Sequence, residues 1–430
     1  MKNIIKAVTV VSLALLSFVV ADKIFNPETI GPGSIFAVLL FLCLSAFSLI
    51  SLRVYRSHKT IVENSWLVFL SILLTYFISD FAAGHLLINP ISPPYQRDPY
   101  VHHSLKPSTT SRLQMKDIHY TQSTNSLGLR GREVDVVKNS DTFRILMLGD
   151  SFTMGHGVND DETFSVLLER SLQGKHVAIK GKSTVEVLNA GVGSYAPVLS
   201  FLQLTKKLSA LDPDLVVLNF DMSDLIQETA YRKAATYGVD GEIVGVSGME
   251  PLAPVARAKH WIDQNFYLTR LALFYVDRLG NPPEPTIESV VTLAYPDLLK
   301  HTLAEDSVDR TAQWESVFAS VTGIKAFCDD HHSDFLLTVY PWGHQVNETE
   351  WVPGGEEFIP DHAFISDKSI DTIQDFGRTH SIEVLNVFPK FRAYNGAARL
   401  YYKYDLHWTP QGHKIMAEGL EEYLEQRYSP

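Results

Sequence analysis

Apolar residues are concentrated at the start of the chain and are more scattered afterwards. Three nearly uninterrupted apolar stretches cover residues 4–21, 35–52 and 66–88. Since about 20 consecutive apolar residues cross the hydrocarbon core of a bilayer, all three are predicted to be transmembrane helices. Residues 1–92 are therefore predicted to form a membrane region with three spans.

Basic residues in the connecting loops predict the orientation of these helices. The loop after the second stretch contains Arg53, Arg56 and Lys59, whereas Lys23 in the first loop is offset by two acidic residues. Because an excess of cations marks the cytoplasmic side, three spans place the rest of the chain on the extracytoplasmic side of the cell membrane. The first stretch also fits a cleavable signal peptide, since it has Lys2 and Lys6 at its start and a short apolar core. Both interpretations give the body of the protein the same location.

From residue 141 onward, short apolar runs alternate with stretches of helical periodicity. The predicted strands are Arg144–Leu148, Val185–Leu188, Leu215–Asn219, Phe335–Val339 and Glu383–Leu385. The predicted helices are Glu162–Leu172, Pro197–Leu208, Gln313–Asp329, Ser369–His380 and Pro410–Arg427. Strands that are continuous apolar runs, each followed by a helix, predict a mostly parallel sheet covered on both faces. Residues 141–430 are thus predicted to form a three-layer α/β domain.

Two segments depart from this alternation. Residues 93–140 begin with many Pro, Ser and Thr residues, which predicts an extended connector and then a lead-in to the domain. Residues 225–310 contain glycine turns and aromatic-rich helical sequence, and we interpret them as an insertion beside the functional site.

The charge of the body argues against one class of partner. Residues 1–92 contain six of the 37 Lys and Arg and four of the 49 Asp and Glu, which leaves 31 basic against 45 acidic residues for the remainder. An acidic body disfavours nucleic-acid binding, whose electrostatic footprint is positive. The two cysteines, Cys43 and Cys328, lie in different regions, so no disulfide framework is expected.

Two segments at predicted strand or helix ends contain residues suited to nucleophilic catalysis. Gly149-Asp150-Ser151 directly follows the first strand of the domain, and a serine at such a glycine-flanked turn is exposed. Asp405 and His407 lie two residues apart just before the last helix, where a base and its orienting carboxylate can face the same site. The alternatives are a serine that caps a helix and a surface Asp–His pair.

Three other segments also follow predicted strands. The small residues of Asn189–Tyr195 allow backbone amides to approach an oxyanion, although an ordinary strand-to-helix turn has the same composition. Asp221–Asp224 is either a part of the site or a capping cluster for the next helix. Tyr340–Gln345 either lines a substrate pocket or forms a proline turn surrounded by aromatic residues.

In this order, the segments resemble those of the SGNH (GDSL) hydrolase superfamily, over roughly residues 143–428. The resemblance implies a flavodoxin-like sheet, no metal or other cofactor, and ester chemistry through an acyl-enzyme. It implies that Ser151 is the nucleophile and donates one oxyanion N–H, with His407 as the base and Asp405 as its partner. The glycine that donates a second N–H in the family falls at or near Ser194, and Gly191 is an alternative anchor.

The sequence departs from the family pattern at two places. Ser223 stands where the family usually has Asn, and it is predicted to be a third, shorter oxyanion donor; the competing interpretation is a helix cap. Asp405 and His407 are separated by one residue rather than two. The resulting Asp-x-His-Trp sequence resembles the branch that contains bacterial exopolysaccharide O-acetyltransferases.

These observations lead to three hypotheses about function. The first is a membrane-anchored serine esterase that removes O-acyl groups from a glycan or a lipid. The second is an O-acyltransferase that acts on an extracellular polysaccharide and needs a membrane acyltransferase partner to supply the acyl group. The third is a catalytically inactive binding or assembly protein. Metal catalysis fits poorly, because His102-His103 and His331-His332 are adjacent pairs that do not direct both rings at one ion.

Overall fold

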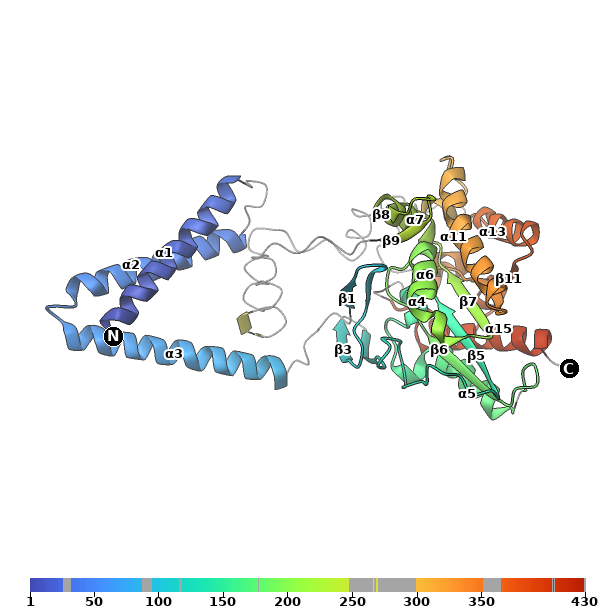
Figure 1. Cartoon of the computed structure of the whole chain (residues 1–430), viewed down its shortest axis with the longest axis horizontal. Coiled ribbons are helices and arrows are strands. Elements are labelled where there is room, and N and C mark those ends of the chain that lie inside the picture. Colours follow the sequence, from blue (N-terminus) through green and yellow to red (C-terminus); the bar gives the residue numbers. More distant parts are fainter. Residues whose placement is uncertain are drawn as a thin grey trace. The chain divides into compact units, whose positions relative to one another are not determined.

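The chain is divided into two units. The computed structural model describes residues 1–25, 32–86, 95–115, 118–176, 178–246, 266, 268–269, 299–350, 365–403, 405 and 407–428. Residues 1–90 and 252–286 form the first unit, and residues 91–251 and 287–430 form the second. Figure 1 labels the elements of both units.

The first unit contains three long helices, which overlap the three apolar stretches of the sequence. They are α1 (Lys2–Phe25), α2 (Pro32–Val54) and α3 (Lys59–Leu86). The hydroxyl of Ser45 donates to that of Ser12 at 2.9 Å and so joins α2 to α1. Among the described residues, the segment Lys59–Ala83 is the one helix with the length and apolar composition needed to cross a membrane.

Part of the long insertion belongs to this first unit. The buried carboxylate of Asp80, on α3, accepts the backbone N–H groups of Leu268 and Thr269, the latter at 3.0 Å. The ring of Phe266 packs edge-on against that of Phe77 at a centroid distance of 5.7 Å. Most of the predicted insertion (residues 247–265, 267 and 270–298) lies outside the described residues.

The second unit is built on a five-stranded parallel sheet. The strands are β5 (Thr142–Leu148), β6 (Thr184–Asn189), β7 (Leu215–Phe220), β10 (Asp334–Val339) and β11 (Glu383–Asn386), in the spatial order β11-β10-β7-β5-β6. Every residue of β5 and β7 is buried, as expected of central strands that are covered on both faces. In chain order this arrangement is 2-1-3-4-5, the flavodoxin-like order, and its switch point lies between β5 and β7. The predicted α/β fold is therefore confirmed.

Helices cover both faces of this sheet. They are α5 (Phe164–Gly174), α6 (Pro197–Gln203), α7 (Asp224–Lys233), α11 (Thr311–Asp330), α13 (Lys368–Thr379), α14 (Phe388–Arg392) and α15 (Pro410–Tyr428). Helix α5 packs against α15, and α11 packs against α6 and α7 (Figure 1). The rings of Phe318 on α11 and Phe376 on α13 stack at a centroid distance of 3.8 Å.

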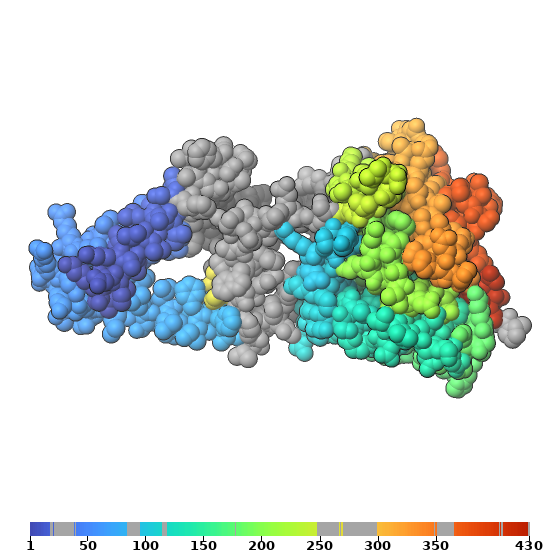
Figure 2. Space-filling model, viewed as in Figure 1, coloured from blue at the N-terminus to red at the C-terminus, as the bar shows by residue number. Residues whose placement is uncertain are grey.

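The segment that precedes the sheet differs from the extended connector expected from the sequence. It forms two antiparallel hairpins, β1 (Tyr95–Asp98) with β2 (His102–Leu105), and β3 (Thr110–Met115) with β4 (Ile118–Ser123). Val101 and Leu105 are buried in a hydrophobic cluster with Met154 and Val198, so the first hairpin packs onto the body. Figure 2 shows this early segment covering one side of the second unit.

Candidate active site

The turn after β5 presents a serine at the carboxyl edge of the sheet. Helix α4 (Ser151–Met154) begins at Ser151, and the carboxylate of Asp150 caps it by accepting a backbone N–H at 2.9 Å. Gly149 has a φ of 148°, and a Cβ at this position would lie 2.3 Å from Oγ1 of Thr153, so the turn requires glycine. As the first residue of the helix, Ser151 has a backbone N–H with no acceptor inside the helix.

Ser151, His407 and Asp405 form one hydrogen-bonded triad. Nε2 of His407 lies 2.7 Å from Oγ of Ser151, and its Nδ1 lies 2.5 Å from Oδ1 of Asp405. The backbone N–H of His407 also donates to Oδ1 of Asp405, at 2.9 Å. The geometry thus brings together the three residues that the sequence predicted to be catalytic. It is the arrangement in which an imidazole can accept a serine proton while a carboxylate fixes its tautomer.

The electrostatics of Asp405 suit this arrangement. Burial by itself raises the pKa of the Asp405 carboxyl group, but the charge and the hydrogen bond of His407 outweigh it and hold this pKa below its usual range. The side chain of Asp405 is only 7% exposed, whereas that of His407 is 21% exposed. The carboxylate is therefore anionic and shielded, while the imidazole remains accessible to a substrate.

Backbone hydrogen bonds hold the loop of Asp405 and His407 in place. The carbonyl of His407 accepts the N–H of Tyr402 at 3.0 Å, and the N–H of Thr409 donates to the carbonyl of Leu400 at 2.8 Å. Trp408 is almost fully buried between these two contacts. These two backbone hydrogen bonds hold the loop, and with it the imidazole of His407, in position.

The segment after β6 contains two of the predicted oxyanion residues, Gly191 and Ser194. Ser194 has a φ of 61°, in the left-handed region that favours glycine. The N–H of Gly191, in contrast, donates to Oδ1 of Asn189 at 3.0 Å. A Cβ on Gly191 would lie 2.2 Å from the backbone nitrogen of Met154. Gly191 therefore permits a close approach of two backbone segments, and its N–H is already occupied.

Ser223 does not have the orientation expected of an oxyanion donor. Its hydroxyl is buried and donates to Oδ2 of Asp221. A hydroxyl has one proton, so in this arrangement Ser223 has none to donate to a reacting oxygen. The competing prediction of a side-chain cap is also not observed, although Ser223 is the residue that precedes α7.

Three buried carboxyl groups, those of Asp150, Asp221 and Asp224, form a cluster next to the serine turn. Burial raises the pKa of all three carboxyl groups. The rise is largest for Asp150 and Asp224, because repulsion from neighbouring carboxyl groups raises their pKa further. The hydroxyl of Tyr340 donates to Asp150 at 3.2 Å, and the indole N–H of Trp342 donates to Asp221. Both aromatic side chains are buried. Tyr340 and Trp342 therefore pack against the carboxyl groups next to the serine turn.

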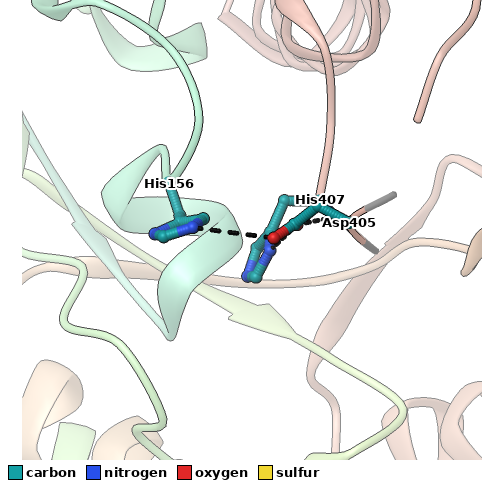
Figure 3. A group of neighbouring side chains, drawn as sticks. All are labelled: His156, Asp405 and His407. Carbon is teal, nitrogen blue, oxygen red and sulfur yellow. Dashed lines mark hydrogen bonds and ion pairs between the residues drawn. The ribbon is translucent and has the colours of Figure 1, made fainter. Parts of the chain in front are cut away.

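A second histidine, which the sequence analysis did not assign to the site, lies beside the triad (Figure 3). The ring centroid of His156 is 4.5 Å from that of His407, and its Nε2 is 3.8 Å from Oδ2 of Asp405. Its Nδ1 lies 2.9 Å from the hydroxyl of Tyr120. Burial lowers the pKa of His156 to about 3, so the ring is neutral. The sequence signal for this residue was its position between two glycines just after the serine turn.

The first hairpin also contributes residues near the site. Nε2 of His103 lies 2.8 Å from the carbonyl oxygen of Gly193, and the hydroxyl of Tyr195 donates to the carbonyl of His103 at 2.6 Å. A Cβ on Gly193 would lie 2.2 Å from the hydroxyl oxygen of Tyr95. The segment next to Ser194 is therefore held by a part of the chain that the sequence predicted to be a connector.

The fold and the triad define the class of this protein as an α/β protein with a Ser–His–Asp site at the carboxyl edge of a parallel sheet. Comparison with family models gave no match, and comparison with curated proteins gave none either. The chain is similar to solved structures of an acetylxylan esterase from Geobacillus stearothermophilus and of the lipase/acylhydrolase from Enterococcus faecalis.

These similarities are distant in sequence. The esterase is 10% identical over 67% of this chain and 96% of its own, with a TM-score of 0.34. The lipase/acylhydrolase is 14% identical over 67% of this chain and 97% of its own, also with a TM-score of 0.34. At such values the likeness does not assign an activity, so the functional argument has to come from the site itself.

Proposed function

We propose that this chain is a serine esterase, anchored in the membrane, that removes O-acyl groups from a glycan or a lipid on the extracytoplasmic side. The observation that carries the proposal is the triad, in which His407 lies 2.7 Å from Oγ of Ser151 and 2.5 Å from Oδ1 of Asp405. No simpler structural role requires a buried carboxylate, an accessible imidazole and a serine in series at a sheet edge.

In the proposed reaction, Oγ of Ser151 attacks the ester carbonyl while Nε2 of His407 takes the serine proton. Asp405 stabilises the imidazolium that forms, and the backbone N–H groups of Ser151 and Ser194 stabilise the oxyanion. His407 then gives the proton to the leaving alcohol, which leaves an acyl group on Ser151. A water molecule, deprotonated by His407, hydrolyses this acyl-enzyme and restores the free serine.

The first unit supports the membrane part of the proposal. Helix α3 exposes apolar side chains along the segment that is long enough to cross a bilayer, among them Ile72 at 65%, Leu74 at 62% and Ile78 at 60% exposure. A large exposed apolar surface of this kind needs a lipid or protein partner. The cations at the end of α2, in the following turn and at the start of α3 (Arg53, Arg56 and Lys59) support a cytoplasmic location for this junction. A reporter fused after residue 92 should then be exported, and a cytoplasmic signal there would refute this topology.

The esterase proposal is tested by intact-protein mass spectrometry after incubation with an activated ester such as p-nitrophenyl acetate. The wild-type protein should gain one acetyl group and release p-nitrophenol, and the Ser151→Ala variant should do neither. Control variant Ser316→Ala removes an exposed serine on α11 and should behave like the wild type. If the wild-type protein gains no acyl group and releases no product, the chain is better explained as an inactive binding or assembly protein.

One observation favours a second function, O-acyl transfer to a polysaccharide. The Asp405-Leu406-His407-Trp408 sequence resembles the spacing in exopolysaccharide O-acetyltransferases. The same acyl-enzyme would then be resolved by a sugar hydroxyl, with the acyl group supplied by a membrane partner. Adding an oligosaccharide acceptor to the acylated protein distinguishes the two: a transferase gives an acylated sugar, whereas an esterase gives only free acid.

A further inference from the structure

The two histidines and the aspartate at the site bring three potential metal ligands together (Figure 3). One ligand atom from each of His156, Asp405 and His407 lies within 4.8 Å of the other two. His156 comes from the turn after α4, whereas the other two come from the loop before α15. His156 is about 250 residues away from the other two in the sequence, so no local spacing of histidines marks the cluster.

The donor set is one that Zn²⁺ prefers. Imidazole nitrogen and carboxylate oxygen bind this ion at about 2.0–2.2 Å, and three protein ligands with a water molecule complete a tetrahedral site. Two such bonds that meet at a tetrahedral angle separate their ligand atoms by about 3.3–3.6 Å, so the 3.8 Å between Nε2 of His156 and Oδ2 of Asp405 has to shorten by only a few tenths of an ångström to share an ion. Nδ1 of His407, 2.5 Å from Oδ1 of Asp405, faces the same carboxylate.

A further contact of His156 supports this assignment. A histidine that binds a metal usually donates its other ring N–H to an oxygen, which fixes the tautomer. The hydroxyl oxygen of Tyr120 lies 2.9 Å from Nδ1 of His156 and can accept that N–H. Nε2 of His156 then presents its lone pair toward Asp405. The nearby guanidinium of Arg130 does not take part, because it donates to Asp160 and to backbone carbonyls.

We propose that His156, Asp405 and His407 form an inhibitory Zn²⁺ site, a function that rests on the esterase activity proposed above. When the ion binds Nδ1 of His407, the proton on that nitrogen moves to Nε2, so the imidazole stays neutral. Nε2 then carries a hydrogen that faces Oγ of Ser151 and cannot accept the serine proton. The ion therefore stops acyl transfer by fixing the wrong tautomer, and a chelator that removes the ion restores activity.

The test measures hydrolysis of p-nitrophenyl acetate by the full-length protein at increasing concentrations of ZnCl₂. Wild-type protein should be inhibited and should recover fully on addition of EDTA. His156→Phe, which keeps a ring but removes a ligand, should need at least about 100-fold more zinc for half-inhibition, and Tyr120→Phe about 10- to 100-fold more. The control His331→Gln, at an exposed histidine after α11, should have the wild-type zinc dependence.

Two results would overturn the site. One is an active wild-type protein that zinc does not inhibit, and the other is equal zinc sensitivity in wild type, His156→Phe and Tyr120→Phe. Failure of the esterase proposal is a separate outcome, since the protein would then hydrolyse no ester even without zinc. In that event, calorimetric titration with ZnCl₂ still decides the metal site: the wild type should bind one ion, and His156→Phe should bind it at least about 100-fold more weakly.

Discussion

Replacing Ser223 with alanine should reduce stability and leave catalysis largely intact. In the structure, the Ser223 hydroxyl donates to the buried carboxyl group of Asp221. A hydrogen bond to a charged group contributes about 1.5–3 kcal/mol to stability. For a domain of this size each kcal/mol corresponds to about 2–4 °C in Tm, so Ser223→Ala should lower Tm by roughly 3–12 °C.

The loss should depend on pH with a predictable sign. The Ser223 hydrogen bond lowers the pKa of Asp221 and thus stabilises its anion, against burial, which raises this pKa. Below the pKa of Asp221, where its carboxyl group is protonated in both proteins, the stability difference should shrink. It should grow as the pH rises and the group ionises. Thermal melting across a pH series, together with kcat for p-nitrophenyl acetate at each pH, measures both quantities.

A matched control is available in the same domain. Ser200 is also buried, but its hydroxyl has no hydrogen-bond partner among the described residues, so Ser200→Ala should be nearly neutral at every pH. Loss of a true oxyanion donor typically lowers kcat by about 100- to 1,000-fold. A fall of that size in Ser223→Ala, with an unchanged Tm, would refute the argument and return Ser223 to the oxyanion site.

Five other variants, one of them followed across a pH series, give further tests. Ser151→Ala and His407→Ala should each lower kcat by about four to six orders of magnitude with little change in Tm, and Asp405→Asn should cost as much or less. Steady-state kinetics and melting curves measure both quantities, and near-normal turnover in any folded alanine variant would exclude the triad. Because burial raises the pKa of Asp224, its protonated form stabilises the fold, and this stability should be complete below the ordinary carboxyl pKa of about 4 and be lost as the pH rises through the elevated value. Asp224→Asn should therefore flatten the fall of Tm at rising pH, and an unaltered profile would contradict the assignment. Gly191→Ala should lower the yield of folded protein, because its Cβ would lie 2.2 Å from a backbone nitrogen; wild-type Tm and yield would show that the two segments can separate.

The fold could be predicted because its central strands have a strong signal. Runs such as Leu215–Asn219 are apolar at every position but the last, and they coincide with strands that are covered on both faces. The three residues of the triad were also found from the sequence, since each lies in a short segment at the end of a strand or just before a helix. Their mutual distances follow from the sheet order, which brings the turn after β5 and the loop before α15 to one edge.

Other features depend on contacts that a local pattern does not contain. The first hairpin is held by Tyr95, Val101 and Leu105, which are isolated among polar residues, so its burial was not visible. The orientation of Ser223 depends on the buried carboxyl group of Asp221. This group also accepts the indole N–H of Trp342, which follows a different strand. Periodicity and spacing describe neighbours along the chain, whereas the packing of the hairpin and the contact of Trp342 with Asp221 join residues that are far apart in the sequence.

The division of the chain into units has a consequence for dissecting the protein. The chain leaves the first unit near residue 90, returns to it for residues 252–286, and then re-enters the second unit. A single proteolytic cut between α3 and β1 would therefore leave the two fragments associated through the contacts that Phe266, Leu268 and Thr269 of the returning segment make with α3. A fragment that begins at Tyr95 would carry this segment without Asp80, so the N–H groups of Leu268 and Thr269 would lose their acceptor. A fragment limited to the second unit should consequently require a short linker in place of residues 252–286 as well as removal of the first three helices.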